Sequence, residues 1–417
     1  MILGLLLARA GVEVTVVEKH ADFIRDFRGD TVHASTLTLL DELGLGERFA
    51  EIPHRLLNRI LVQFDGGTVP VVDFRRLPGR HQHIGLVPQW DFLELIAAAA
   101  REEPAFRLIR NAEVTALLYE GRRVAGVRWV DRTSGAAHEL RAALTVGCDG
   151  RESAVRRASG VRARSFGVPI DVWWFRLPRD VGDPEGGFAR ISSHNFCLML
   201  DRGGYWQCAY LIGKGRDQAL RAAGIDHLHR SLVSLLPWMA GRVDHLASWE
   251  DVKLLKVQLN RVRRWDRAGL LLIGDAAHAM SPVGGVGINL AVQDAVAAAN
   301  ILAGPLREGR LTADHLRRVQ RRRWWTTVLL QGVQQIAHRF AANPGHAQQD
   351  FGPPNVVHSP AGSPATSAST RHLPRPVRVL QRWPILQCLP GWLVAIGPRP
   401  EHAPGWARRA ATPRPAN

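Results

Sequence analysis

The pattern of apolar and polar positions predicts α/β architecture at both ends of the first 300 residues. An apolar run over 1–10, a turn and the continuous β-rich run 12–18 predict a helix followed by a buried strand. The runs 144–150 and 269–275 have the same uninterrupted apolar character, and the second leads into an Ala-rich helix over about 288–302. Strands that are apolar on both faces are typical of a parallel sheet covered by helices.

A different pattern lies between these segments, from about residue 166 to residue 260. Short aromatic-rich strands occur at 172–175, 205–212 and 252–259, and a helix is predicted near 217–236. This pattern predicts a separate, mainly antiparallel sheet. The other predicted elements are a helix over 35–43 that Ser35 can cap, a hairpin over 60–74, a helix over 90–101 and strands over 106–119 and 123–130.

The composition limits the partners and the compartment. The net charge is +16, but only four of the 54 basic residues are lysines and the arginines are scattered, so we expect no nucleic-acid partner. The four cysteines stand far apart without histidines at metal-ligand spacing, which predicts no metal site and a reducing cytoplasm. No run of about 20 uncharged apolar residues occurs, so we expect no integral membrane association. The apolar start lacks a basic segment before it and predicts a buried helix rather than a secretion signal.

The most informative motif is the segment from Gly274 to Asn289, where an apolar strand, an acid at its end and a Gly-rich entry to a helix follow one another. An aspartate at a strand end, Asp275, can accept hydrogen bonds from a polyol chain, and glycines allow the backbone to approach a flat ring closely. The N–H groups of a helix that begins near Gly287 favour negative charge. This combination predicts a site for a redox cofactor rather than a turn that merely caps a helix.

Two weaker signals accompany this motif. Asp149 and Gly150 end a strand and open a helix that contains Arg156, although Asp-Gly before a serine is also common turn chemistry. Glu18 ends the strand 12–18, which is where dinucleotide folds bind a ribose hydroxyl, although many strands end in a carboxylate.

Together the three motifs resemble the class A FAD-dependent aromatic hydroxylases, the p-hydroxybenzoate hydroxylase family, in order and spacing over about residues 1–340. In that family the acid matching Glu18 holds the adenosine ribose, and Arg28 resembles the arginine that meets the phosphate and ribose of FAD. Gln89 resembles the flavin-contacting glutamine, and Asp275 would bind the ribitol. The resemblance thus implies a cofactor-binding set made of Glu18, Arg28, Gln89, Val114, Asp149, Gly150, Gly274, Asp275, Pro282, Gly284, Gly285, Val286, Gly287, Ile288 and Asn289.

The resemblance also implies the fold, which is α/β, with a Rossmann-like FAD-binding domain and an inserted, mainly antiparallel β substrate domain. We expect the FAD-binding domain in 1–60, 81–163 and 261–340, and the substrate domain in 61–80 and 164–260. Composition predicts a flexible linker over 341–372, which is dense in Pro, Gly, Ser and His, a short helical segment over 373–402 and a disordered tail over 403–417.

One departure from the family concerns the start of the chain. Members begin with a strand and a Gly-x-Gly-x-x-Gly loop whose N–H groups bind the pyrophosphate, and no such loop precedes the helix that begins at Met1. We therefore expect a gap in the parallel sheet and weaker FAD binding. An inactive remnant that binds FAD poorly is one alternative that this departure leaves open.

The chemistry implied by the resemblance is aromatic hydroxylation. NADH or NADPH reduces FAD transiently, the flavin reacts with O2, and a flavin hydroperoxide transfers one oxygen atom to an aromatic or other electron-rich small molecule. The cofactor performs the difficult step, so no catalytic side chain is expected, and His278 is expected to make a structural hydrogen bond. Trp173, Trp206 and Tyr210 are candidate substrate contacts, although only about half of such strand residues can face the flavin. A homodimer is compatible with this class.

Other members of the wider flavin fold remain as alternatives, namely a flavin-dependent halogenase or a reductase of isoprenoid double bonds. The Trp-x-Trp-x-Ile-Pro motif of the halogenases does not occur in this chain. Dependence of the product on chloride would distinguish the halogenase from the hydroxylase.

Overall fold

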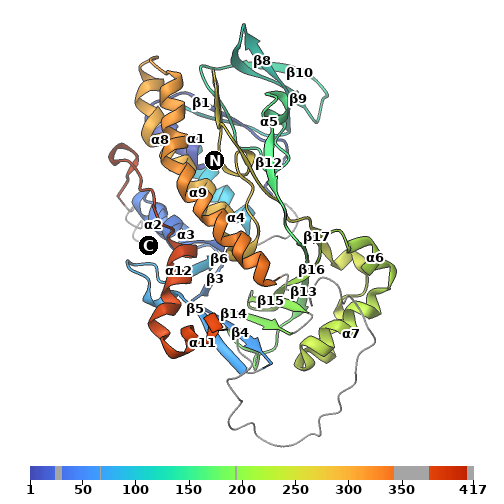
Figure 1. Cartoon of the computed structure of the whole chain (residues 1–417). Helices are drawn as coiled ribbons and strands as arrows, with labels where there is room; N and C mark the ends of the chain where they lie inside the picture. The colour runs from blue at the N-terminus through green and yellow to red at the C-terminus, as the bar shows by residue number, and fades with distance from the viewer. Residues whose placement is uncertain (24–30, 66, 193–194, 342–374, 411–417) are drawn as a thin grey trace, which may run out of the picture.

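The computed structural model describes residues 1–23, 31–65, 67–192, 195–341 and 375–410. Two packed regions make up the molecule, one built around parallel strands and one built around a seven-stranded sheet. The long helix α9 (Ala313–Ala341) extends from the first region toward the second (Figure 1). Arg28 lies outside the described residues, so its predicted contact with FAD stays a prediction.

Short parallel strands lie at the centre of the first region. β1 (Val14–Val17) pairs in parallel with β7 (Phe106–Ile109), and β11 (Thr145–Gly147) pairs in parallel with β20 (Leu270–Leu272). The predicted strands are therefore confirmed in position, but the predicted burial is confirmed only for β20, because all residues of β1 are half-buried. Helix α1 (Ile2–Arg9) packs against β1, and Leu5 and Leu6 of this helix are fully buried.

The other elements of the first region surround these strands and bury one large apolar core. Its helices include α4 (Gln89–Arg101), α5 (Ala154–Ala158) and α8 (Val286–Arg307). Its remaining strands and helices are β2 (Thr31–Val32), α2 (Ala34–Glu42), α3 (Gly46–Ala50), β3 (Arg55–Leu57), β6 (Ile84–Leu86), β8 (Ala112–Glu120), β9 (Arg123–Asp131), β10 (Ala137–Arg141), β12 (Ala163–Phe166), β18 (Leu259–Val262) and β19 (Asp266–Arg267).

Helix α8 is the most apolar long helix of the described chain. Together with the turn before it, Val283–Arg307 is long and apolar enough to cross a membrane, and 72% of its apolar window is buried inside the structure. Asp294, a charged residue in the middle of this helix, is completely buried. A buried charge with protein partners is typical of a helix that packs inside a protein core.

The second region is a seven-stranded sheet in the order β17, β13, β16, β15, β14, β4 and β5. All of its neighbouring strands pair antiparallel except β14 (Gly187–Ile191) and β4 (Arg59–Phe64), which pair in parallel. The predicted hairpin is confirmed as β4 and β5. The other strands are β5 (Gly67–Asp73), β13 (Ile170–Pro178), β15 (Phe196–Asp201), β16 (Tyr205–Gly213) and β17 (Lys253–Leu255).

Two helices cover one face of this sheet, where the sequence pattern predicted one. They are α6 (Asp217–Ala222) and α7 (Ile225–Leu235), followed by the 3-10 helix η2 (Pro237–His245). Gly224 separates them with a φ of 87°, a backbone conformation that ends a helix and that glycine adopts without steric cost. The apolar side chains of α7 and η2 pack on the sheet and form a second core.

The C-terminal segment returns to both regions. Helix α11 (Arg375–Arg382) and helix α12 (Cys388–Ala395) lie against β5. The predicted disorder of the tail is wrong for residues 403–410, because Ala407 is fully buried and its carbonyl accepts a hydrogen bond from Arg9 at 2.8 Å. Residues 411–417 and most of the predicted linker lie outside the described residues.

Candidate cofactor site

The glycine-rich segment forms a tight loop between β20 and α8. Gly284 and Gly285 have φ values of 79° and 64°, which L side chains rarely adopt. A Cβ atom on Gly285 would lie 3.0 Å from Oγ1 of Thr31, and one on Gly284 would lie 3.4 Å from Cγ2 of Val394. The glycines are therefore required for backbone geometry and for close approach, as the motif predicted. We call residues 274–289 the glycine loop.

Asp275 lies at the partly exposed side of the glycine loop. Its carboxylate is 30% exposed and lies 3.2 Å from Nε of Arg151. The Arg151 guanidinium also donates to the carbonyl of Met280 at 3.2 Å. A Cβ atom on Gly287 would lie 4.0 Å from Oδ1 of Asp275, so this carboxylate lies beside the start of α8. The arrangement fits a polyol such as ribitol, because the accessible carboxylate of Asp275 can accept hydrogen bonds and the backbone at Gly287 beside it carries no side chain.

The segment from Asp149 to Arg156 forms a second loop that is bonded to the glycine loop. Asp149 accepts hydrogen bonds from the Ser153 hydroxyl and from the Val155 backbone N–H, at 3.1 Å for the latter. Ser153 is the N-cap residue of α5, and its hydroxyl accepts from the Arg156 backbone N–H at 2.9 Å. The buried Arg156 donates to the carbonyl of Ala276 at 2.9 Å. Gly150 has a φ of 84°. These contacts join the two loops mechanically, and a direct contact of Asp149 or Gly150 with a cofactor stays a prediction.

Glu18, Gln89 and Val114, the described residues predicted from the first 120 positions, lie on elements other than the glycine loop. Glu18 follows β1 and accepts a hydrogen bond from the backbone N–H of His20 at 2.9 Å. Glu18 follows β1 and Asp149 follows β11, and the charges of both carboxylates act on the Cys148 thiol. Gln89 begins α4 and is half-buried, and the half-buried Val114 on β8 packs against the large core.

Asn289 connects the glycine loop to α2. Its side-chain oxygen accepts hydrogen bonds from the hydroxyls of Ser35 and Thr36, both at 2.8 Å. The Ser35 hydroxyl also lies 3.2 Å from the carbonyl of Ala395. The prediction that Ser35 caps α2 is therefore wrong, because the N-cap residue is His33 and the Ser35 hydroxyl bonds to other elements.

His33 was not predicted as a site residue, and it joins the glycine loop to the C-terminal segment. Its Nδ1 lies 2.7 Å from the carbonyl of Val394, and its Nε2 lies 3.3 Å from Oγ1 of Thr31. Burial lowers the pKa of His33 to about 4, although hydrogen bonds to backbone carbonyls oppose that effect. The imidazole is therefore neutral at pH 7, and its Nδ1–H donates to Val394.

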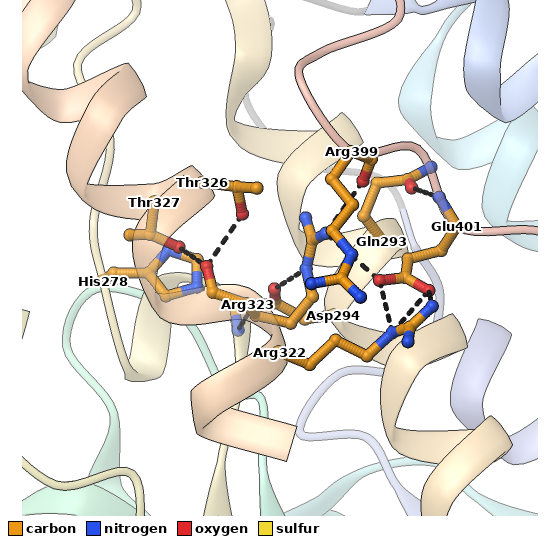
Figure 2. Close-up of polar contacts among 10 residues, drawn as sticks. His278, Gln293, Asp294, Arg322, Arg323, Thr326, Thr327, Arg399 and Glu401 are labelled. Carbon is orange, nitrogen blue, oxygen red and sulfur yellow. Dashed lines mark hydrogen bonds and ion pairs between the residues drawn. The ribbon is translucent and has the colours of Figure 1, made fainter. Parts of the chain in front are cut away.

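A buried charge network lies behind the glycine loop (Figure 2). His278 Nε2 lies 2.6 Å from one oxygen of Asp294, which confirms the predicted structural hydrogen bond of His278. The other oxygen accepts from Nε of Arg323 at 3.1 Å. Burial raises the pKa of Asp294, but the charges and hydrogen bonds of His278 and Arg323 outweigh burial and hold the pKa below its usual range.

The same network binds the C-terminal segment to helix α9. Arg322 donates to both carboxylate oxygens of Glu401, at 2.8 and 2.7 Å, and Arg323 Nη1 lies 3.4 Å from Glu401. Arg323 also donates to the carbonyl of Arg399 at 3.1 Å, and Gln293 accepts from the backbone N–H of Glu401. The side chain of Glu401 is fully buried. We call His278, Asp294, Arg322, Arg323 and Glu401 the buried charge network.

The aromatic residues predicted as substrate contacts belong to the core between the sheet and α7. Trp173, Trp206 and Tyr210 are at most 3% exposed. Their polar atoms already have partners, since Trp173 donates to Asp217, Trp206 to Asp183 and Tyr210 to Asn195, at 2.7, 2.9 and 2.6 Å. The geometry gives these side chains structural roles in the core rather than contacts with a substrate. Among the described residues, no group of His, Cys, Asp or Glu side chains could hold a metal ion.

Known proteins resemble this chain in sequence and in structure. A family model described as an FAD binding domain matches residues 1–327. A 6-methylpretetramide 4-monooxygenase from Streptomyces rimosus is 34% identical over 350 residues, which are 82% of each chain. A rifampicin monooxygenase from Streptomyces venezuelae is 26% identical over 306 residues, 70% of this chain and 60% of that protein.

Solved structures agree with this placement. The crystal structure of a probable FAD-dependent monooxygenase from Pseudomonas aeruginosa superposes with a TM-score of 0.70 at 20% identity, covering 82% of this chain and 93% of that one. At this identity the likeness shows the fold, which is the α/β FAD-binding fold with an added β-sheet region. The family match covers more than half of the chain, and the chain therefore belongs to the FAD binding domain family as an FAD-dependent monooxygenase.

Proposed function

We propose that this chain hydroxylates an aromatic small molecule with O2, with NADH or NADPH as the transient electron donor. The proposal rests on the geometry of the glycine loop. Within this loop, the accessible carboxylate of Asp275 lies beside the glycines that begin a 22-residue helix. Such a place suits the ribitol and the flat ring of a flavin. When bound, FAD would supply the redox chemistry that activates O2.

The protein's own residues would position and enclose the reactants. Asp275 would accept hydrogen bonds from the ribitol hydroxyls, and the backbone from Pro282 to Asn289 would lie along the ring. The N–H groups at the start of α8 would favour negative charge on the ring edge. His33 and Asn289 would keep the loop backbone in place through their bonds to Val394 and Ser35.

The proposed substrate is a fused-ring aromatic compound that carries oxygen substituents. The names of the relatives favour this class, because they act on 6-methylpretetramide, anhydrotetracycline and rifampicin. The proposed domains remain 1–60, 81–163 and 261–340 for FAD and 61–80 and 164–260 for the substrate, and the seven-stranded sheet that joins β4 and β5 to β13–β17 supports this division. A cytoplasmic location and a homodimer are part of the same proposal.

The test begins with the visible spectrum of the purified full chain after incubation with FAD and gel filtration. Retained flavin bands, together with NADH or NADPH oxidation that an aromatic substrate stimulates, are expected. Mass spectrometry should find one ¹⁸O atom in the product formed under ¹⁸O2. A chain that retains flavin but forms product without ¹⁸O would contradict the monooxygenase proposal, and boiled protein and Asp275→Ala provide the controls.

A further inference from the structure

The two faces of the seven-stranded sheet differ in how their polar groups are satisfied. Successive residues of a strand point to opposite faces. On β13 and β16, Trp173 and Trp206 point toward α7, and their indole donors have carboxylate partners. Trp174 and Gln207, one position later in each strand, point to the opposite face. On that opposite face, buried N–H donors lack hydrogen-bond acceptors within the described part of the chain.

Trp174 and Gln207 each carry a buried donor without an acceptor. Trp174 is 5% exposed and Gln207 is fully buried. Neither Nε1 of Trp174 nor Nε2 of Gln207 has a hydrogen-bond partner among the described residues. The orientation of the Gln207 amide is set, because its Oε1 accepts from Nε of Arg202 at 2.7 Å. Native proteins leave few buried donors unpaired, so two on one face require an explanation.

The two donors are neighbours on the sheet. Trp174 lies opposite Ala209, and Gln207 lies opposite Arg176 two positions away on the same face. Diagonal neighbours of this kind are roughly 7 Å apart, within reach of the two ends of one small molecule. Arg176 on this face is exposed to solvent, so this face of the sheet reaches the protein surface next to Gln207.

The same face leads directly to the glycine loop. Leu198 lies beside Ala209 in the sheet, and Leu200 lies beside Gln207. Both leucines belong to the apolar cluster that includes Val394 and Ala395 of the C-terminal segment. Val394 in turn packs with Val286 and approaches Gly284. The donors therefore face the region between the sheet and the proposed flavin ring.

We propose that Trp174 and Gln207 bind carbonyl or phenolic oxygens of a planar aromatic substrate and so hold its ring against this face. The inference rests on the proposed function and adds the recognition chemistry to it. Two adjacent N–H donors in an apolar surround of Leu198, Ala209 and Val172 select a flat apolar ligand with acceptor oxygens. A hydrocarbon of the same shape would leave both donors unpaired, so the site discriminates against it.

The experiment compares two probes on the full chain with FAD present, xanthone and xanthene, which share a tricyclic frame and differ in the ketone oxygen. Dissociation constants come from equilibrium dialysis, and thermal unfolding of each variant is recorded in parallel. Trp174→Phe removes the indole donor and keeps an aromatic ring, and Gln207→Met removes the amide at similar volume. Trp173→Phe is the matched control, because it removes a donor on the opposite face.

We expect wild type to bind xanthone more tightly than xanthene. Trp174→Phe and Gln207→Met should each weaken xanthone binding by about three- to tenfold and leave xanthene binding unchanged. Trp173→Phe should lower the melting temperature through loss of the Asp217 contact and leave both dissociation constants unchanged. Equal affinity of wild type for the two probes, binding of neither, or xanthone binding by Trp174→Phe at the wild-type level would overturn the inference.

The outcome is separable from that of the proposed function. Flavin retention and substrate-stimulated NADH or NADPH oxidation report on the function, and probe binding by the resting protein reports on the two donors. Retained flavin and ¹⁸O incorporation, with xanthone binding unchanged in both variants, would refute only the proposal that Trp174 and Gln207 bind the substrate. Loss of all flavin with intact discrimination between the probes would refute the function and leave the donor site in place.

Discussion

The carboxylates on the two sides of the glycine loop differ in their burial and in their number of protein partners. Behind the loop, Asp294 is completely buried and is held by His278, Arg323 and the backbone N–H of Gly274. At the front, Asp275 is 30% exposed and has one arginine beside it, Arg151. The first carboxylate is fully occupied by the protein, and the second keeps acceptor capacity for another molecule.

The difference teaches which charges serve the fold and which are available for a ligand. A buried carboxylate must be paired, because isolated charge in a low-dielectric interior is costly. Arg323 of α9 and His278 and Gly274 of the glycine loop are the partners of Asp294, and Arg323 also contacts Glu401 of the C-terminal segment. Asp275 needs no such support because water still reaches it. Perturbing each side should therefore change different measured quantities.

The largest effect is expected behind the loop. Arg323→Met leaves Asp294 and Glu401 buried without their shared guanidinium, and we expect a loss of about 3–5 kcal/mol in the free energy of unfolding. Urea titration of the FAD-free chain measures this loss. Arg321→Met on the same helix is the matched control, since the Arg321 side chain is 66% exposed and should change stability by less than about 1 kcal/mol. Equal stability of the two variants would mean that the network does not support the fold.

The next effect is a pH dependence that His33 imposes. Its pKa falls from 6.5 in the unfolded chain to about 4 in the folded protein, mainly through burial. The unfolded chain therefore binds the proton first, so the stability contribution is complete above pH 6.5 and is lost as the pH falls toward 4. The expected loss is about 3 kcal/mol. His33→Gln should flatten this part of the stability curve, and an unchanged slope would exclude His33 as its origin.

The third effect lies at the front of the loop and concerns the ligand. Asp275→Asn should weaken FAD binding by about 10- to 100-fold, since a charge-assisted hydrogen bond contributes about 1.5–3 kcal/mol. Stability without FAD should change by less than about 1 kcal/mol, because the contact with Arg151 is partly exposed. Quenching of FAD fluorescence measures the affinity. A stability loss comparable to that of Arg323→Met would erase the distinction between the two sides.

The smallest effect is expected far from both carboxylates. Tyr210→Phe removes the hydroxyl that donates to Asn195 at 2.6 Å and should cost about 1 kcal/mol of stability. Binding of FAD and of xanthone should not change, because this hydroxyl lies on the sheet face that α7 covers. A change in xanthone affinity beyond threefold would instead identify Tyr210 as a substrate contact.

Local sequence predicted the parts of the site that lie close together in the chain. The strand, Asp275, the glycines and the start of the following helix are close together in the chain, and short-range geometry alone requires glycine at Gly284 and Gly285. The same holds for the serine that follows Asp149 and Gly150, because Ser153 is the N-cap residue of α5. His278 was correctly assigned a structural bond, but its partner Asp294 could not be identified, because any nearby acid would have fitted the pattern.

Contacts between distant segments were not predictable. Glu401 lies 78 residues from Arg323, in the segment 373–402 for which the sequence predicted only a short helix and no partner. His33 and Val394 are separated by 361 positions. No periodicity relates such pairs, since each is created only when the C-terminal segment packs against α8 and α9.

The sequence by itself determined the parallel strands, the glycine loop with its acid, and the presence of an aromatic sheet. Alternation along β13 and β16 established that Trp173 and Trp174 point to opposite faces, yet it could not tell which face meets the glycine loop. Tertiary structure decided that question. Helix α7 covers the face of Trp173, Trp206 and Tyr210, whereas the face of Trp174 and Gln207 turns toward the C-terminal segment and the loop. The physical reason is that strand geometry is local, while the side of a sheet that a helix covers depends on packing between elements distant in sequence.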